Sequence, residues 1–344
     1  MVLNKPYVLF LGASQSLGDC KTAAGLRDWC RTDVVGQTAL PGCAVDLGVP
    51  WLTPEQAAQA GARSLVIGVA PFGGDIPPEW RESLLAAAQA GLDIVSGMHS
   101  RLSSVPGLEE AAASSGRRLI DVRHSNRKFP VATGRRRPGR RLLTVGTDCA
   151  LGKKYTALTI AEALRRRKIS ATFRATGQTG IMISGSGVAI DAVIADFIAG
   201  AAESLSPDNQ ADHWDVIEGQ GALFHPAYAG VTVGLVHGSQ PDALVLCHDP
   251  TRTTIDGYPE HPIVDLGWAM SQYLTCARVT NSEARFVGIS LNTSDLESRQ
   301  RAKVKASIQE QYRLPVIDPM LDGADEIAAV LVRDFPAARA KESA

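Results

Sequence analysis

The sequence lacks the features that mark secreted, membrane-spanning and zinc-binding proteins. Its six cysteines are scattered, and no two of them form a C-x-x-C pair. Isolated cysteines favour reduced thiols over a disulfide framework or a structural metal site. The N-terminal residues show no secretory pattern, and no apolar run reaches the roughly 18–20 residues that a membrane span needs. These absences predict a cytoplasmic protein.

Charge of either sign is also not in excess. The chain has 35 Lys and Arg residues and 36 Asp and Glu residues, which gives a formal net charge of -1. No global field therefore draws the chain to nucleic acid or to a membrane. Aromatic residues make up only 6% of the chain, and Phe129 alone lies within its arginine-rich segment, which is unlike the repeated interleaving of RNA-binding surfaces. We expect a small-molecule ligand, with neither nucleic acid nor membrane as a partner.

Short apolar segments alternate with amphipathic ones in the first third of the chain. The expected strands lie at 7–11, 65–69, 93–96 and 119–122, and the expected helices at 16–29, 78–90 and 107–115. Continuously apolar strands separated by helices are typical of a parallel sheet covered on both faces. Residues 1–122 are therefore predicted to form a Rossmann-like α/β domain.

Composition changes over residues 123–141, which carry eight basic residues together with two prolines and two glycines. Proline and glycine interrupt regular structure, and the like charges repel one another. The segment is predicted to be a solvated basic linker between two domains. The alternative is that some of its arginines reach a phosphate or a carboxylate.

The same alternation returns over residues 142–344 and predicts a second parallel-sheet domain. The expected strands lie at 141–145, 172–175, 215–218, 243–247, 286–291 and 316–317. The expected helices lie at 153–167, 188–202, 266–279, 295–312 and 324–333.

The first strand of this second domain leads into a glycine-bounded loop that ends with a lysine at the start of a helix. Backbone N–H groups, the helix N-terminus and the lysine of such a P-loop together bind phosphate. A cation at a helix start is otherwise disfavoured, so the loop is predicted to hold a phosphorylated ligand. The residues expected to bind it are Gly146, Thr147, Asp148, Cys149, Gly152, Lys153 and Lys154.

The loop departs from the common P-loop in two ways. Its glycines are separated by five residues instead of four, and Lys154 stands where a Ser or Thr normally holds Mg²⁺. Thr147 or Asp148 could replace that hydroxyl. Phosphate binding is therefore expected without a metal, and Mg²⁺ is expected only if the ligand is ATP.

Polar segments follow the other predicted strands as well. The carboxyl ends of parallel strands open onto one ligand crevice, so these segments are predicted to converge on a single active site. They supply Arg174, Thr176, Gln178, Thr179, Glu218, Gln220, His237, Ser239, Gln240, Arg252 and Asn292.

These motifs carry two resemblances. The strings GTDCALGKK, EGQGALFHP and GISLN are similar to the dethiobiotin synthetase-like branch of P-loop proteins, where Glu218 and Asn292 match an acidic and a base-contacting position. A closer resemblance, over nearly the whole chain, is to the D-glutamate N-acetyltransferase (DgcN-like) family. It rests on GTDCALGKKYTAL, FRATGQTGI, AIDAVIADFIAGAAE, DVIEGQG and HGSQPDALVLCHDPTR. That resemblance implies acetyl transfer from acetyl-CoA to the amine of D-glutamate, in D-amino acid catabolism.

Under this implication the residues divide into roles. The loop with Lys153 would hold the diphosphate of coenzyme A, which requires no metal. Arginine forks suit the carboxylates of the substrate, so Arg174 and Arg252 are the expected pair. Glu218 or His237 would take the ammonium proton, with His225 and His248 as further candidates. The remaining expected substrate contacts are Thr176, Gln178, Thr179, Gln220, Ser239 and Gln240, the last two as donors to the oxyanion.

Two other functions stay open from the sequence. One is an ATP- and Mg²⁺-dependent ligase- or kinase-like enzyme similar to dethiobiotin synthetase, and the other is a non-catalytic nucleotide-binding protein. An acetyl-thioester on Cys149 is disfavoured, because a loop that cradles phosphates has little room for it. A homo-oligomer is compatible with an enzyme of this size.

Overall fold

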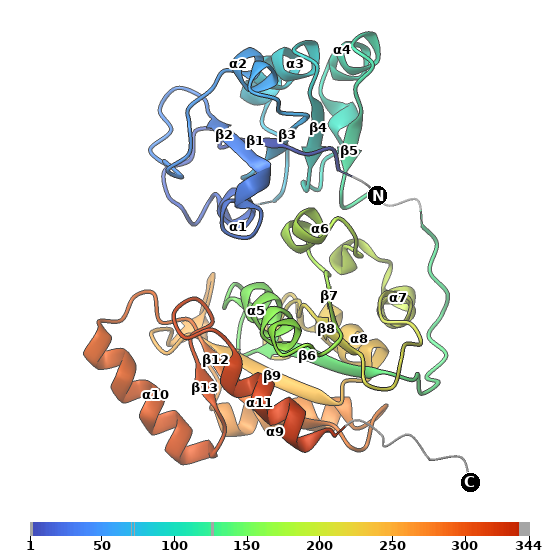
Figure 1. Cartoon of the computed structure of the whole chain (residues 1–344), viewed down its shortest axis with the longest axis vertical. Helices are drawn as coiled ribbons and strands as arrows, with labels where there is room; N and C mark the ends of the chain where they lie inside the picture. Colours follow the sequence, from blue (N-terminus) through green and yellow to red (C-terminus); the bar gives the residue numbers. More distant parts are fainter. Residues whose placement is uncertain (1–2, 70, 72, 125–126, 337–344) are drawn as a thin grey trace. The chain divides into compact units, whose positions relative to one another are not determined.

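A computed structural model describes residues 3–69, 71, 73–124 and 127–336 of the chain (Figure 1). The chain forms two compact units. Unit 1 comprises residues 1–127 and 178–192, and unit 2 comprises residues 128–177 and 193–344. The sequence gives no signal for the return of residues 178–192 to unit 1. Each unit is built on a parallel sheet, so the predicted α/β class is confirmed.

Unit 1 contains a five-stranded sheet of order β2-β1-β3-β4-β5, in which all neighbours are parallel. The strands are β1 (Tyr7–Phe10), β2 (Val34–Thr38), β3 (Ser64–Ile67), β4 (Asp93–Ser96) and β5 (Leu119–Asp121). The helices are α1 (Lys21–Trp29), α2 (Pro54–Gln59), α3 (Arg81–Gln89), α4 (Leu108–Ser114) and α6 (Gln178–Ser184). Helices α2, α3 and α4 cover one face, and α1 and α6 lie on the other (Figure 1). Central strands such as β1 are therefore buried on both faces, which explains their continuous apolar runs.

Strand β2 and helix α2 are not predicted by the sequence pattern. Only the first two residues of β2 are apolar, so the strand lacks the signal that revealed its neighbours. Its Gln37 is buried, and the side chain bonds to Asp46 and to the backbone of Val49 and Leu47. Tertiary hydrogen bonds thus stabilise a strand that hydrophobic periodicity does not predict.

Unit 2 contains a six-stranded parallel sheet of order β13-β12-β9-β6-β8-β7. Its strands are β6 (Arg140–Gly146), β7 (Ala171–Arg174), β8 (Trp214–Ile217), β9 (Ala243–His248), β12 (Arg285–Leu291) and β13 (Val316–Ile317). A small antiparallel hairpin, β10 (Thr254–Ile255) with β11 (Tyr258–Pro262), stands apart from it. The helices are α5 (Lys153–Arg166), α7 (Ile198–Leu205), α8 (Ala229–Ser239), α9 (Leu266–Ala277), α10 (Ser298–Tyr312) and α11 (Asp325–Asp334). Helix α8 packs against α7 and α9, and α5 packs against α11.

Two expectations for secondary structure in this region are wrong. The helix predicted over 188–202 is divided into the 3-10 turns Ile190–Ala192 and Ala195–Phe197, and regular helix begins only at Ile198. Residues 236–239, expected in a loop after a strand, form the last turn of α8. In the part of the chain that the structure describes, no helix is long and apolar enough to cross a membrane.

The basic segment is not solvated throughout. The side chain of Arg141 is fully buried, and Arg137 is nearly so. Arg141 donates to the hydroxyl of Ser206 at 2.9 Å and to the carbonyls of Arg137, Gly139, Pro138 and Pro207. These arginines therefore fasten the start of β6 to its own unit.

Candidate active site

The glycine-bounded loop lies at the centre of the unit 2 sheet. Strand β6 runs between β8 and β9, ends at Gly146, and the chain re-enters regular structure at Lys153, the first residue of α5. Gly152 and Ala150 have φ values of 91° and 54°, in the left-handed region that glycine tolerates best. The loop thus turns sharply from the carboxyl end of the central strand into a helix N-terminus, which is the geometry that binds anions.

The side chain of Lys153 folds back into this loop. Its Nζ donates to the backbone carbonyl of Asp148 at 2.7 Å, and a Cβ added at Gly146 would lie 3.2 Å from Nζ. Only 7% of Lys153 is exposed, and burial lowers the pKa of its ammonium. A buried ammonium held by a carbonyl gains most from an anion nearby, so the loop fits a phosphorylated ligand.

Gly219, just after β8, makes room for this lysine. A Cβ at Gly219 would lie 1.7 Å from the carbonyl oxygen of Thr144 and 3.1 Å from Cδ of Lys153. The backbone N–H of Gly219 donates to the hydroxyl of Thr144 at 3.0 Å, and that hydroxyl donates to the carbonyl of Lys153. Glycine is thus required at position 219 because the Thr144 carbonyl and the Lys153 side chain pass close to its Cα, and not because the backbone turns there.

Asp148 is fully buried and bonded on both carboxylate oxygens. Oδ1 accepts from the backbone N–H of Cys149 at 2.6 Å, and Oδ2 accepts from Arg252 at 2.7 Å and from the N–H of Asp256 at 2.9 Å. Arg252 also donates to the carbonyl of Cys149 at 2.9 Å. The guanidinium expected to bind a substrate carboxylate therefore already pairs with a carboxylate of the protein and ties the β10–β11 region to the loop.

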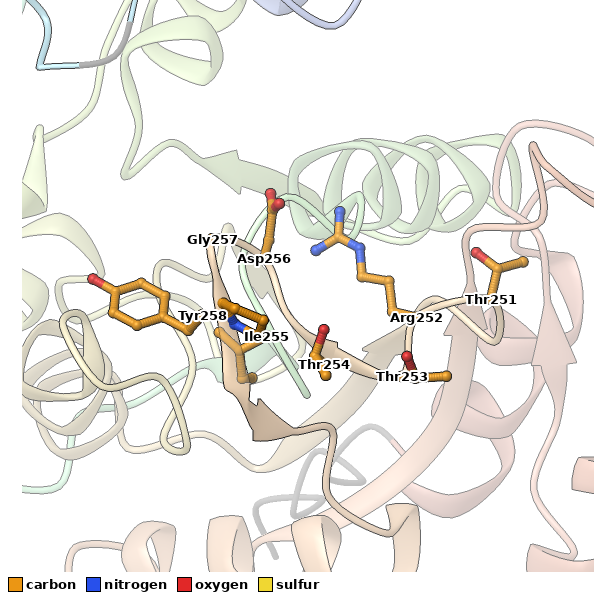
Figure 2. Close-up of a pocket in the computed structure, with 9 residues that line it drawn as sticks. Thr251, Arg252, Thr253, Thr254, Ile255, Asp256, Gly257 and Tyr258 are labelled. Atoms are coloured by element: carbon orange, nitrogen blue, oxygen red, sulfur yellow. The ribbon is translucent and has the colours of Figure 1, made fainter.

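The segment that carries Arg252 also lines a cavity of about 340 Å³, made by residues 251–259. Figure 2 shows the side chains of Arg252 and Asp256 pointing to the same side of this segment, whereas Tyr258 points away from them. The cavity borders the loop because the N–H of Asp256 bonds to Asp148. It is a polar recess beside the anion site.

Glu218 follows the last residue of β8 and is nearly fully buried. Its Oε2 accepts from the backbone N–H groups of Thr176 and Gly177, at 3.0 and 3.1 Å. Burial raises the pKa of the carboxyl, while Lys154 and the two N–H groups lower it by smaller amounts. A Cβ at Gly177 would lie 2.5 Å from the side-chain nitrogen of Gln220. Thr176, Glu218 and Gln220 thus lie together at the carboxyl edge.

Arg174 does not face this group. Its Nε donates to Oδ1 of Asp215 at 2.8 Å, and Asp215 is the second residue of β8. The arginine therefore points back along the sheet toward the strand beginnings. The contact that the structure shows is an ion pair with the buried Asp215, so its geometry does not favour binding of a substrate carboxylate.

The expectation that residues 236–242 follow a strand end is wrong. His237 and Ser239 belong to the last turn of α8, and Gln240 caps it before β9 begins at Ala243. This junction lies at the amino end of β9, so it is at the sheet edge opposite the loop. His237 Nε2 lies 3.4 Å from the Cys276 sulfur, and Gln240 donates to the carbonyl of Gly134 at 2.9 Å. Neither contact favours a role in acyl transfer at the loop.

Gln178 and Thr179 begin α6 and so belong to unit 1. The Thr179 hydroxyl lies 2.8 Å from that of Thr22, and the Gln178 side chain occupies the space above Gly97, where a Cβ would lie 1.7 Å from Oε1. Both side chains therefore pack within unit 1.

Strands β9 and β12 place two further polar residues near the loop. Thr147 Oγ1 lies 3.0 Å from Nδ1 of His248, whose pKa is lowered by burial to about 4. Asn292, after β12, donates to Oδ2 of Asp249 at 3.2 Å. These contacts hold the three strand ends of β6, β9 and β12 in register.

The sequence did not reveal two residues that contact the loop. Tyr273 of α9 is buried, donates to the carbonyl of Gly146 at 2.8 Å and accepts from the N–H of Leu223 at 3.1 Å. Asp256 contacts Asp148 through its backbone. A tyrosine on the buried side of a helix cannot be distinguished in the sequence from other core residues. Asp256 makes its contact through the backbone, which does not depend on residue type, so no sequence signal could identify either residue.

Asp148, Cys149 and His225 each bring one ligand atom within 4.8 Å of the others, and this is the single such group among the described residues. Nδ1 of His225, however, accepts from the N–H of Ala227 at 3.1 Å. The neutral ring then carries its proton on Nε2 and has no lone pair left for a metal. Asp148 is also occupied by protein donors, so the group fits a hydrogen-bonding role better than a metal ion.

Two family models match the chain, one in the region of each parallel sheet. Residues 34–125 match a family model described as a domain of unknown function (DUF1611_N), a Rossmann-like domain. Residues 130–328 match one described as a domain of unknown function (DUF1611_C), a P-loop domain.

Full-length relatives are also similar to this chain. A D-glutamate N-acetyltransferase from Tritonibacter scottomollicae is 47% identical over 333 residues, which cover 96% of this chain and 100% of the relative. A protein of the same name from a Pseudoalteromonas species is 43% identical over 331 residues, with the same coverage. The crystal structure of a DUF1611 family protein from Anabaena variabilis superposes with a TM-score of 0.85 at 34% identity, covering 96% of this chain and all of that one.

Proposed function

The chain belongs to the DUF1611 family, and on this premise we propose that it is a D-glutamate N-acetyltransferase with acetyl-CoA as its acyl donor. The observation that carries the proposal is the similarity to two proteins of that name along their entire lengths. The activity moves an acetyl group to the amine of D-glutamate and gives N-acetyl-D-glutamate.

The loop at the end of β6 is the site for the diphosphate of coenzyme A. Its backbone N–H groups, the N-terminus of α5 and the ammonium of Lys153 all favour an anion there. The buried Lys153 supports this assignment, because a carbonyl of its own loop is the partner that it now holds. Bound acetyl-CoA supplies the thioester carbonyl, and the chain supplies orientation and the proton acceptor.

Glu218 is the proton acceptor. Acyl transfer requires the neutral amine, so the substrate ammonium must first lose a proton. Burial raises the pKa of Glu218 above the ordinary carboxyl range, which makes its carboxylate a stronger base than an exposed one. The N–H groups of Thr176 and Gly177 hold Oε2 in place. Gln220, whose side-chain nitrogen lies close to Gly177, is the neighbouring donor that can orient the substrate.

The test is release of free thiol from acetyl-CoA in the presence of D-glutamate, with L-glutamate and no amino acid as parallel reactions. Lys153→Ala should lower kcat/KM for acetyl-CoA by about 100-fold, because it removes a charge-assisted contact to the diphosphate. Lys303→Ala is the matched control, since Lys303 is an exposed lysine of α10. No thiol release from acetyl-CoA with D-glutamate by the unaltered protein would overturn the proposal.

A further inference from the structure

His225 is the group near the phosphate loop that the mechanism above does not use. It lies in the segment between β8 and α8, and only 2% of it is exposed. One of its ring nitrogens is within 4.8 Å of the Asp148 carboxylate and of the Cys149 sulfur. The imidazole therefore reaches the same loop as Lys153 from a different part of the chain.

Contacts on three sides fix the ring. Nδ1 accepts from the backbone N–H of Ala227 at 3.1 Å. The ring centroid lies 4.5 Å from that of Tyr228 and 5.1 Å from that of Tyr258, which meets it edge-on. Because Nδ1 already accepts a hydrogen bond, the neutral imidazole must carry its proton on Nε2. The ring is thus held as the Nε2–H tautomer.

The surroundings also keep the ring uncharged. Burial lowers the pKa of His225; Lys153 and His261 lower it further, while Asp148 and Asp256 oppose them. A proton added at Nδ1 would in addition point at the Ala227 N–H group that now donates to it. The imidazole is therefore a neutral donor at physiological pH, as hydrogen-bond geometry and burial both require.

Among the residues that the structure describes, none accepts a hydrogen bond from Nε2 of His225. Nε2 is not among the polar atoms that are buried without a partner, so it stays open to solvent, and a donor that no protein group engages is available to a ligand. We propose that Nε2–H of His225 donates to the diphosphate of the acyl donor and completes the cradle begun by Lys153. This inference rests on the proposed function, because the diphosphate is that of acetyl-CoA.

The same geometry argues against His225 as a base for Cys149. A catalytic thiol needs a neighbour that can accept its proton, and an Nε2–H group cannot do so. Burial also raises the pKa of the Cys149 thiol, which keeps it protonated and a poor nucleophile. The pair is therefore better suited to binding an anion than to forming an acetyl-thioester.

Two variants and two acyl donors test the inference. His225→Gln places an amide N–H near the position of Nε2, whereas His225→Asn can keep the contact to Ala227 but cannot reach as far. Acetyl-CoA carries the diphosphate, and acetylpantetheine lacks it. Initial rates with D-glutamate should be measured for both donors, together with the melting temperature of each variant.

We expect KM for acetyl-CoA to rise about tenfold in His225→Asn, as for loss of one charge-assisted hydrogen bond. His225→Gln should recover to within about threefold of the unaltered protein, and kcat/KM for acetylpantetheine should change less than about threefold in either variant. Equal losses with both donors would overturn the inference, because His225 would then act on the reacting centre or on folding. An unchanged KM for acetyl-CoA would overturn it as well.

Failure of the proposed function is distinguishable from failure of this inference. If neither donor is turned over, the acetyltransferase proposal falls, and calorimetric titration with coenzyme A then tests His225 alone. Weaker binding of coenzyme A by His225→Asn than by His225→Gln would still support the donor role. Equal binding by the two variants would overturn it.

Discussion

Unit 2 buries a cation at each edge of its sheet, Arg141 at the amino edge and Lys153 at the carboxyl edge, and the two differ in their partners. At the amino edge, the guanidinium of Arg141 donates to the Ser206 hydroxyl and to four carbonyls, and Ser206 in turn donates to Asp215 at 2.7 Å. At the carboxyl edge, Lys153 holds one carbonyl of its own loop, and Nε2 of His225 has no acceptor among the described residues.

The comparison separates charge that stabilises a fold from charge prepared for a ligand. A buried charge whose partners all come from the protein has been compensated by folding, so its removal should cost stability. A donor beside the loop without a full set of protein partners can be engaged by a ligand, so its removal should cost binding or rate. Substitutions at the two edges should therefore move different measurements.

Arg141→Met should give the largest change in stability. It leaves the buried Ser206 hydroxyl, the buried carbonyl of Arg137 and three part-buried carbonyls without their donor, and such losses cost about 3–5 kcal/mol. For a unit of this size the melting temperature should fall by about 10 °C. Activity of the folded fraction should persist, because Arg141 lies at the edge opposite the loop.

The matched control for this substitution is Arg135→Met. Arg135 pairs with Asp208 at 2.9 Å, but both side chains are more than half exposed, and exposed pairs contribute about 0–1 kcal/mol. Thermal unfolding of the two variants should therefore differ clearly. Equal melting temperatures would show that the amino-edge network does not hold the fold.

Glu218→Gln should give the largest change in rate at the opposite edge. The amide oxygen can still accept from the Thr176 and Gly177 N–H groups, but the amide cannot take a proton, so kcat/KM should fall about 1000-fold. Stability should be kept or slightly raised, because the variant no longer buries a carboxylate. Steady-state kinetics and thermal unfolding measure the two effects, and a variant within tenfold of the unaltered rate would exclude Glu218 as the base.

The pH profile should show the same carboxyl. The base must be ionised, and burial raises the pKa of Glu218. The rate should therefore decline with falling pH at values above the ordinary carboxyl range, and it should be level at higher pH. A decline confined to the pH of an unperturbed glutamate would contradict this placement of the base.

His248 should make the carboxyl edge sensitive to acid. Its pKa in the folded chain is lowered by burial to about 4, from an ordinary value of 6.5. The unfolded chain therefore binds a proton first, so stability is fully present above about pH 6.5 and declines as the pH falls toward 4. At about 1.4 kcal/mol per pKa unit, the loss approaches about 3 kcal/mol.

His248→Gln tests this linkage. The variant should lose less stability than the unaltered protein between pH 7 and pH 4, as measured by urea unfolding at a series of pH values. Parallel stability curves over that interval would show that His248 titrates normally in the folded chain.

The parts of the fold that the sequence predicts are those with local signals. An apolar strand, two glycines and a lysine at a helix start stand within about a dozen consecutive residues, and the structure has β6, the loop and α5 there. Glu218 likewise follows a strand made of buried residues. Each of these features depends on neighbours along the chain, so periodicity and residue type suffice.

What the sequence could not predict depends on partners far along the chain. Arg174 and Arg252 look equivalent as strand-end arginines, yet one bonds to Asp215 and the other to Asp148. Helix α8 was hidden because its glycines weaken a helical pattern. Gly234 and Gly238 serve its packing on α7, where a Cβ at Gly238 would lie 2.1 Å from the carbonyl oxygen of Ala199.

The smallest predicted effect contrasts two glycines that only the folded structure distinguishes. Gly219→Ala adds a methyl group 1.7 Å from the Thr144 carbonyl oxygen and 3.1 Å from the Lys153 stem, so the backbone must shift together with the lysine, and kcat/KM of the folded protein should fall about tenfold. Gly230→Ala, in the first turn of α8, meets no atom within 4 Å and sits at an exposed position. It should leave the kinetics unchanged and raise stability by about 0.5–1 kcal/mol, since alanine favours a helix. If the two variants had equal kcat/KM, the close passage of Lys153 over Gly219 would not control the site. A tenfold difference would show that the backbone just after β8 positions the lysine that the loop presents to its ligand.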